Sequence, residues 1–135
     1  METANDRLEY LEVLEKIKKD GVCPFCPEHL LKYHKKPILL DGEFWIVTEN
    51  MYPYKNTLFH FLFIHKRHIE TVLDLSKDSW SELHLLHKWL IKTRGILGGT
   101  IIFRFGNNDR TGSSVKHLHA QLVVGKQDMP VITRI

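Results

Sequence analysis

The sequence predicts an α+β fold built around a mainly antiparallel sheet, and three observations support this. Helical patterns occupy residues 3–19 and 74–94, and short apolar runs precede and follow the second pattern. Asp41 and Gly42 separate two of these runs, as a hairpin turn would. Strands that precede and follow one long helix in the sequence are typical of an α+β fold with an antiparallel sheet. The chain has 135 residues, so we expect a single domain spanning 1–135.

Both helices are predicted from apolar residues that recur about once per turn. In the N-terminal helix, expected within residues 1–20, they are Leu8, Leu11, Leu14 and Ile17. In the long helix over residues 74–94, they are Trp80, Leu83, Leu86 and Leu90. Gly95 follows the long helix as a stop signal. We expect His84 and His87 at the surface of this helix.

Five stretches combine apolar residues with flanking turn signals and predict strands. They are residues 36–41, 43–49, 57–65, 100–105 and 116–124. The stretch TLFHFLFIH at 57–65 is apolar nearly throughout, which favours a central strand. Three polar or proline-containing stretches predict loops: residues 21–37, 50–57 and 106–114.

The composition restricts the classes of protein and of ligand. The chain is 43% hydrophobic and 26% charged, as soluble globular domains are. Its formal net charge of +3 is too small to argue for nucleic acid, but it suits an anionic small-molecule ligand. No apolar run approaches the roughly 18 residues of a membrane span, and the charged N-terminus does not resemble a signal peptide. We therefore expect a cytoplasmic protein that does not bind a membrane.

One strand concentrates polar side chains on a single face. Because side chains alternate along a strand, His117, His119 and Gln121 share one face of the stretch 116–124. Just upstream, residues 111–114 offer hydroxyls and flexible backbone amides that suit phosphate oxygens. The alternative is a half-buried strand whose polar face meets solvent.

The segment GSSVKHLHAQLVVG, residues 112–125, resembles the histidine-triad (HIT) signature, His-x-His-x-His followed by apolar residues. Gln121 takes the place of the third histidine. This variant resembles the branch that holds galactose-1-phosphate uridylyltransferase and the diadenosine polyphosphate phosphorylases. The resemblance covers roughly residues 22–125 and implies a HIT-like fold with a mainly antiparallel sheet, one long helix and an N-terminal helix.

The resemblance implies catalytic roles for three residues. The second histidine of the motif is the nucleophile in this family, which corresponds to His119. The third position hydrogen-bonds phosphate oxygens, which corresponds to Gln121. The serine before the motif contacts phosphate, which corresponds to Ser114. Independently of the family, a neutral imidazole is a competent nucleophile near neutral pH.

The resemblance also implies substrate-binding residues. Asn50 matches the position that usually binds the ribose, and His60 matches a position near the phosphates. Ser113 and Gly112, in the loop before the motif, are expected to assist at the phosphates. The expected ligand is a nucleoside phosphate, with an adenine nucleotide favoured. A homodimer is expected from the resemblance alone.

The implied activity is that of a nucleotidyl hydrolase or transferase acting at the α-phosphate through a covalent nucleotidyl-histidine. An amide at position 121 cannot transfer protons, so discharge of this adduct to a phosphate acceptor is favoured over hydrolysis. The alternative is a non-catalytic nucleotide-binding or sensor protein of the same fold.

The two cysteines form one CPFC motif within residues 21–37, where a zinc knuckle is predicted. Cys23 and Cys26 have the two-residue gap that allows both thiolates to bind one zinc ion. A thioredoxin-like redox pair is disfavoured because no strand precedes the motif. His29 and His34 are local candidates for the remaining two ligands.

The resemblance implies a different ligand set, in which His68 and His117 complete the site with the two cysteines. Four protein ligands would make it a structural zinc site, one per chain. A zinc-knuckle RNA-binding module would instead use the local histidines with nearby lysines and Tyr33. That alternative leaves the histidine strand unexplained, so nucleic acid is disfavoured as a partner.

Overall fold

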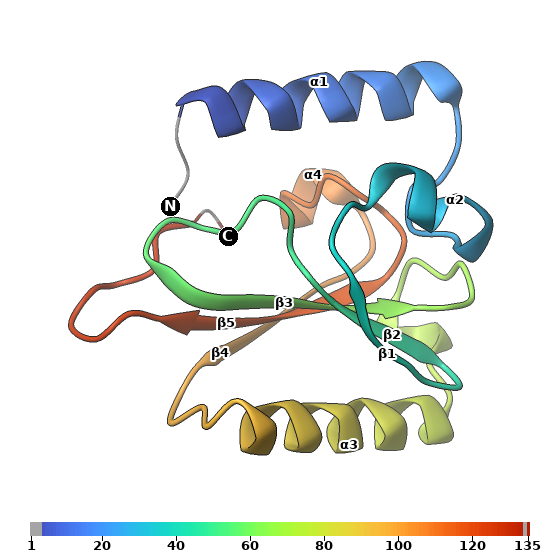
Figure 1. Ribbon diagram of the computed structural model, residues 1–135. Helices are drawn as coiled ribbons and strands as arrows, with labels where there is room; N and C mark the ends of the chain where they lie inside the picture. The colour runs from blue at the N-terminus through green and yellow to red at the C-terminus, as the bar shows by residue number, and fades with distance from the viewer. Residues whose placement is uncertain (1–3, 134) are drawn as a thin grey trace.

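The computed structural model describes residues 4–133 and residue 135, and it contains one antiparallel sheet with helices on both faces (Figure 1). The elements are α1 (Ala4–Asp20), α2 (Pro27–Tyr33), β1 (Ile38–Asp41), β2 (Trp45–Glu49), β3 (Thr57–His65), a 3-10 turn (Val72–Asp74), α3 (Lys77–Thr93), β4 (Thr100–Arg104), α4 (Asn108–Thr111) and β5 (His119–Gly125). The sheet has the strand order β1-β2-β3-β5-β4, and all neighbours are antiparallel. The predicted α+β class is therefore confirmed.

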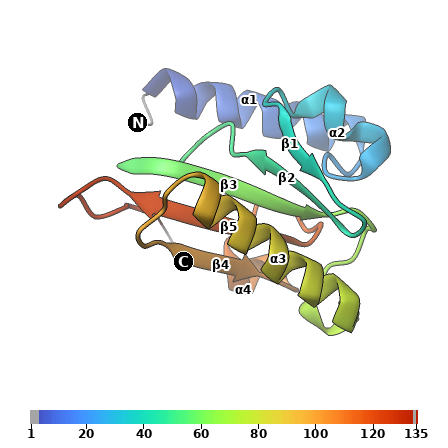
Figure 2. The same ribbon diagram turned by 60° about the horizontal axis from the view of Figure 1, so that its bottom comes forward.

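The strand β3 lies at the centre of the sheet because its apolar run can be buried on both faces. Phe61 and Phe63 pack towards α3 in the main core, while Leu62 and Ile64 join a smaller cluster with Leu30 of α2. Burying each of these side chains contributes about 1.5–3 kcal/mol. Figure 2 shows α3 running along one face of the sheet, and α1 and α2 lie on the other side.

The helix α3 begins at an N-cap, where Ser76 Oγ accepts a hydrogen bond from Ser79 N–H at 3.0 Å. His84 is exposed, as expected. The expectation for His87 is wrong, because this side chain is only 7% exposed and stacks on Phe63 with ring centroids 4.0 Å apart. Position 87 follows Leu83 by one turn, so it belongs to the apolar stripe that faces the sheet.

Two short helices lie in stretches that were predicted to be loops. Pro27 occupies the first turn of α2, where its missing N–H leaves no donor unsatisfied. The side chain of Asn107 caps α4, and Gly112 ends it in the left-handed conformation at φ 67°. Both helices are too short for an apolar periodicity to be recognised.

The strand β5 begins at His119, three residues later than predicted. Leu118 N–H donates to Ile69 O at 2.8 Å, and Leu118 O accepts from His65 N–H at 3.2 Å. His117 therefore lies in a connecting segment rather than in the strand. The predicted alternation still holds across this boundary, since Leu118 and Ala120 belong to the main core.

The N-terminal helix α1 lies above the sheet on the side opposite α3 (Figure 1). It ends before Gly21, whose φ of 68° suits glycine. Leu8 is 59% exposed, whereas Val13, Leu14 and Ile17 are half-buried and face the space below the helix. Within the described residues, no helix is long and apolar enough to cross a membrane.

Candidate functional site: a Cys/His cluster beside a cavity

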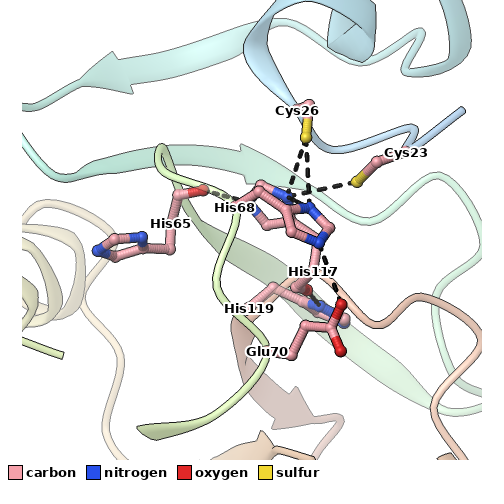
Figure 3. Close-up of polar contacts among 7 residues, drawn as sticks. All are labelled: Cys23, Cys26, His65, His68, Glu70, His117 and His119. Carbon is pink, nitrogen blue, oxygen red and sulfur yellow. Dashed lines mark hydrogen bonds and ion pairs between the residues drawn. The ribbon is translucent and has the colours of Figure 1, made fainter. Parts of the chain in front are cut away.

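Two cysteines and two histidines from distant parts of the chain meet next to the start of β5 (Figure 3). Cys23 and Cys26 lie between α1 and α2, His68 follows β3, and His117 precedes β5. One potential ligand atom from each residue lies within 4.8 Å of the other three. His117 is buried, the cysteines are half-buried and His68 is exposed.

Four of the separations between these atoms are close to those between the ligands of a tetrahedral metal. Cys26 Sγ lies 3.3 Å from His68 Nδ1 and 3.6 Å from His117 Nδ1. Cys23 Sγ lies 3.4 Å from His117 Nδ1, and the two Nδ1 atoms are 3.2 Å apart. Bonds of about 2.3 Å to sulfur and about 2.0 Å to nitrogen place the ligands of zinc about 3.3–3.7 Å apart. The four residues therefore fit a zinc ion.

Hydrogen bonds leave each histidine of the cluster with its Nδ1 lone pair available. His117 Nε2–H donates to the carbonyl of His65, and His68 Nε2–H donates to the Glu70 carboxylate at 3.2 Å. Metal-binding imidazoles are commonly oriented in this way by a carbonyl or carboxylate on the opposite nitrogen. Burial lowers the pKa of His117 to about 4, which keeps this imidazole neutral.

The thiol of Cys26 needs a nearby cation to become a thiolate. Burial is the main cause that raises its pKa to about 12, and the neighbouring Cys23 thiol raises it further. A bound zinc ion would supply the positive charge that deprotonates both thiols.

The local alternative, with His29 and His34 as ligands, does not match the structure. His34 is buried, and its Nε2–H donates to Thr48 Oγ at 2.7 Å. His34 is the C-cap residue that follows α2, and it lies against β2 rather than beside the cysteines. Within the described part of the chain, the cluster that could hold a metal contains neither His29 nor His34.

A cavity of about 670 Å³ lies between α1 and the sheet, beside the Cys/His cluster. This volume is typical of small-molecule sites. Six of the predicted site residues contribute to its lining: Asn50, Gly112, Ser113, Ser114, His119 and Gln121. Helix α1 contributes Tyr10, Val13, Leu14 and Ile17.

His119 forms part of the cavity wall and is only 8% exposed. Its Nδ1–H donates to the carbonyl of His117 at 2.8 Å, which leaves Nε2 unprotonated. Burial lowers the pKa of His119, and the positive charge of Arg104 lowers it further. Phe25 packs edge-on against the ring at 5.0 Å between centroids. The imidazole is therefore neutral and held in one orientation, as a nucleophile requires.

Gln121 is oriented by His60 from the neighbouring strand β3. Tyr54 N–H donates to His60 Nδ1 at 3.1 Å, so His60 Nε2 carries the proton and donates it to Gln121 Oε1 at 2.6 Å. This leaves the NH2 group of Gln121 as a donor for a ligand. Asn50 Nδ2 lies 3.3 Å from the same His60 nitrogen. Burial lowers the pKa of His60 to about 4.

The two serines before the motif have different contacts. Ser113 Oγ donates to the carbonyl of Val115 at 2.7 Å, so this hydroxyl stabilises the loop itself. Ser114 Oγ shares a hydrogen bond with the hydroxyl of Tyr10 on α1. Tyr10 also packs edge-on against Tyr52, with ring centroids 5.1 Å apart.

Sequence reasoning did not identify Arg104 or Tyr10 as site residues. Arg104 lies on β4, directly opposite His119 in the strand pairing, and its Nη1–H donates to Tyr54 Oη at 2.7 Å. Its proximity to His119 depends on which strands pair, and no local pattern contains that information. Tyr10 occupies an ordinary position of an amphipathic helix, which also carries no signal.

The chain matches no protein-family model and no curated protein by sequence. Its fold, however, matches solved structures of histidine-triad proteins. A HIT family hydrolase from Clostridium thermocellum has 26% identity and a TM-score of 0.60, with 82% of this chain and 96% of that one covered. A Zn-bound histidine triad family protein from Mycobacterium smegmatis has 16% identity and a TM-score of 0.65, with 84% and 82% covered. A histidine triad nucleotide-binding protein from Candida albicans has 18% identity and a TM-score of 0.63, with 84% and 87% covered. The chain therefore has the HIT fold.

Proposed function

We propose that the protein is a nucleotidyl hydrolase or transferase that acts at the α-phosphate of a nucleoside phosphate, with an adenine nucleotide as the expected substrate. The observation that carries this proposal is the buried, neutral His119 in the wall of a large cavity, beside Gln121 and the loop that holds Ser114. Solved structures of the same fold include proteins described as a hydrolase and as nucleotide-binding.

In the proposed reaction, His119 Nε2 attacks the α-phosphorus with its lone pair. The bond between phosphorus and the leaving-group oxygen breaks, and its electron pair departs with that oxygen, which takes a proton from solvent. The product is a nucleotidyl-histidine. Water or a phosphate acceptor then attacks the same phosphorus, and His119 is restored. The hydrogen bond from Nδ1–H to the His117 carbonyl stabilises the positive charge that develops on the imidazole.

The donors around His119 stabilise charge on the phosphate oxygens. Gln121 and Ser114 both line the cavity, and the donors that they offer are an NH2 group and a hydroxyl. Because His60 holds the Gln121 side chain in place, this donor needs little reorganisation during the reaction. An amide and a hydroxyl supply hydrogen bonds but do not exchange protons near neutral pH, so the leaving group receives no general-acid assistance from them.

Intact-protein mass spectrometry after brief exposure to a panel of nucleotide substrates tests the proposal. The expected result is a mass increase equal to one nucleotidyl group. The alternative function is that of a non-catalytic nucleotide-binding or sensor protein of the same fold. Tight nucleotide binding without an adduct and without turnover would support the sensor and contradict the enzyme.

We also propose that Cys23, Cys26, His68 and His117 bind one structural zinc ion per chain. The support is the donor set, the tetrahedral separations and the orientation of both imidazoles. Bound zinc supplies a cross-link between the segment after α1 and the ends of β3 and β5. His117 lies two residues before His119, so the same cross-link restrains the proposed nucleophile.

A homodimer is proposed as the solution state. The strand β4 forms one edge of the sheet, and Ile101 and Phe105 on or beside it are exposed. An edge strand with exposed apolar side chains offers both hydrogen-bonding groups and apolar area to a second copy. Sedimentation equilibrium at micromolar concentration checks this, and a monomer mass of 15.9 kDa would contradict it.

A further inference from the structure

Arg104 is a cation beside the proposed nucleophile that the reaction described above does not use. It pairs directly with His119 in the β4–β5 ladder, and directly opposite residues of an antiparallel pair project from the same face of the sheet. Both residues line the 670 Å³ cavity. The guanidinium and the imidazole therefore share one wall of the cavity.

The guanidinium is held in position by a chain of contacts. Its Nη1–H donates to Tyr54 Oη at 2.7 Å, and the Tyr54 ring packs on His60 with centroids 4.3 Å apart. His60 in turn donates to Gln121 at 2.6 Å. The cation is thus connected to the same group of side chains that orients the phosphate donor Gln121, and it is half-buried.

We propose that Arg104 binds a second anionic group of the substrate, adjacent to the phosphate that His119 attacks. This inference rests on the proposed function and specifies its substrate class: nucleotides with two neighbouring anions, such as a diphosphate, are preferred over monophosphates. A guanidinium is always charged and presents five N–H donors in a planar fork that matches phosphate or carboxylate oxygens. In the proposed reaction, Ser114 and Gln121 bind the first phosphate, and they lie on β5 and the loop before it. Arg104 lies on the neighbouring strand β4, so we expect a second anion to bind on the β4 side of the first phosphate.

The test compares two probes that share a nucleoside and differ in the second anion. Adenosine monophosphate carries one phosphate, and adenosine 5′-(α,β-methylene)diphosphate carries two that are joined by a stable carbon bridge. Titration calorimetry on the zinc-loaded full chain measures the Kd of both for the wild type, Arg104→Gln and Arg104→Lys. Arg94→Gln is the matched control, because Arg94 is an exposed arginine at the end of α3 on the opposite face of the sheet.

Arg104→Gln is expected to weaken the diphosphate analogue by about tenfold or more and the monophosphate by less than about threefold, as expected for loss of a charge-assisted contact to one group only. Arg104→Lys keeps the charge but loses the fork, so it is expected to weaken the analogue by several-fold. Arg94→Gln, which removes the same net charge, is expected to leave both Kd values unchanged.

The outcomes separate this inference from the function on which it rests. If the wild type binds neither probe, the proposed function is wrong and the inference falls with it. If the wild type binds both and the Arg104 variants weaken both equally or neither, nucleotide binding stands and the role of Arg104 is wrong. Thermal melting checks that the variants are folded. If Arg104→Gln does not fold, the Kd values of Arg104→Lys test the role of Arg104 instead.

Discussion

Hydrogen bonds within the protein determine which nitrogen of each histidine is left to react. His117 and His68 are held at Nε2 by a carbonyl and a carboxylate, so both present Nδ1 to the cysteines. His119, two residues after His117, is held at Nδ1 by a carbonyl, so it presents Nε2. Neighbouring histidines of one motif are thereby suited to different chemistry, one to metal binding and one to nucleophilic attack.

His119→Ala is expected to abolish the nucleotidyl adduct and turnover while leaving the Kd for nucleotide within about tenfold of wild type, because other residues make most binding contacts. Intact-protein mass spectrometry and titration calorimetry measure the two effects. His84→Ala serves as the control, since His84 is an exposed histidine on α3. An adduct that still forms on His119→Ala would remove this residue as the nucleophile.

Gln121→His is expected to shift discharge of the adduct from phosphate acceptors towards water. An imidazole can accept a proton from incoming water near neutral pH, whereas the wild-type amide cannot. The isolated adduct is followed with and without inorganic phosphate, and the wild type is expected to decay faster with it. Gln121→Asn retains an amide and is expected to keep the wild-type preference. Equal wild-type decay under both conditions would contradict the transferase preference.

At the scale of elements, the segment at residues 21–26 between α1 and α2 belongs to no helix or strand, and we expect its proposed metal to hold it in place. Cys23→Ser is expected to lose zinc and to lower the Tm by about 10 °C or more, because metal binding contributes to folding free energy. Elemental analysis and thermal melting measure this. His29→Ala is the matched control and is expected to retain zinc. Zinc lost in His29→Ala but retained in a His68→Ala/His117→Ala double variant would favour the local knuckle instead.

The helix α1 covers one side of the cavity and contacts Ser114, a proposed hydrogen-bond donor to the phosphate. Ser114 Oγ and the Tyr10 hydroxyl are hydrogen-bonded, and where Ser114 is the donor, a phosphate that takes its one proton must displace Tyr10. Tyr10→Phe removes this competition and is expected to lower the Kd for nucleotide by about two- to tenfold. This factor corresponds to the net free energy of one hydrogen bond. Titration calorimetry measures the change. Leu8→Ala, an exposed position on the same helix, is expected to have no effect, and a weaker Kd for Tyr10→Phe would show that Tyr10 assists binding.

At the scale of the whole molecule, the fold could be predicted where the apolar pattern is local and long. The limits of β3 match the predicted strand at residues 57–65, because nine residues bounded by turn signals carry a strong pattern. The short helices α2 and α4 could not be predicted, since fewer than two turns show no periodicity. The start of β5 was predicted too early because Leu118 pairs with the segment after β3, which is a tertiary contact.

The candidate site could be predicted to the extent that it lies in one continuous motif. His119 and Gln121 come to the cavity because both occupy the same face of β5. The resemblance suggested that His68 and His117 join the cysteines, and the structure brings the four residues together. Arg104 required the strand order, since β4 reaches His119 only because it pairs with β5 at the sheet edge.

The stability of the whole molecule is expected to fall with pH between about 6.5 and 4. Burial is the main cause that lowers the pKa of several histidines within the described residues, and it brings His60 to about 4. The unfolded chain titrates these groups near pH 6.5. Below this pH the unfolded state binds protons that the folded state excludes, so stability is present above pH 6.5 and is lost as the pH falls.

His60 isolates one part of this effect. With a pKa of about 4 when folded and about 6.5 when unfolded, His60 alone costs about 2 kcal/mol of stability between pH 7.5 and pH 5. His60→Gln keeps a donor for Gln121 but does not titrate, so its free energy of unfolding is expected to fall by about 2 kcal/mol less than that of wild type. Urea denaturation at both pH values measures the difference. Metal release affects both proteins alike, because His60 lies outside the Cys/His cluster. Equal losses of the free energy of unfolding in the two proteins would therefore show that His60 is not held neutral by burial.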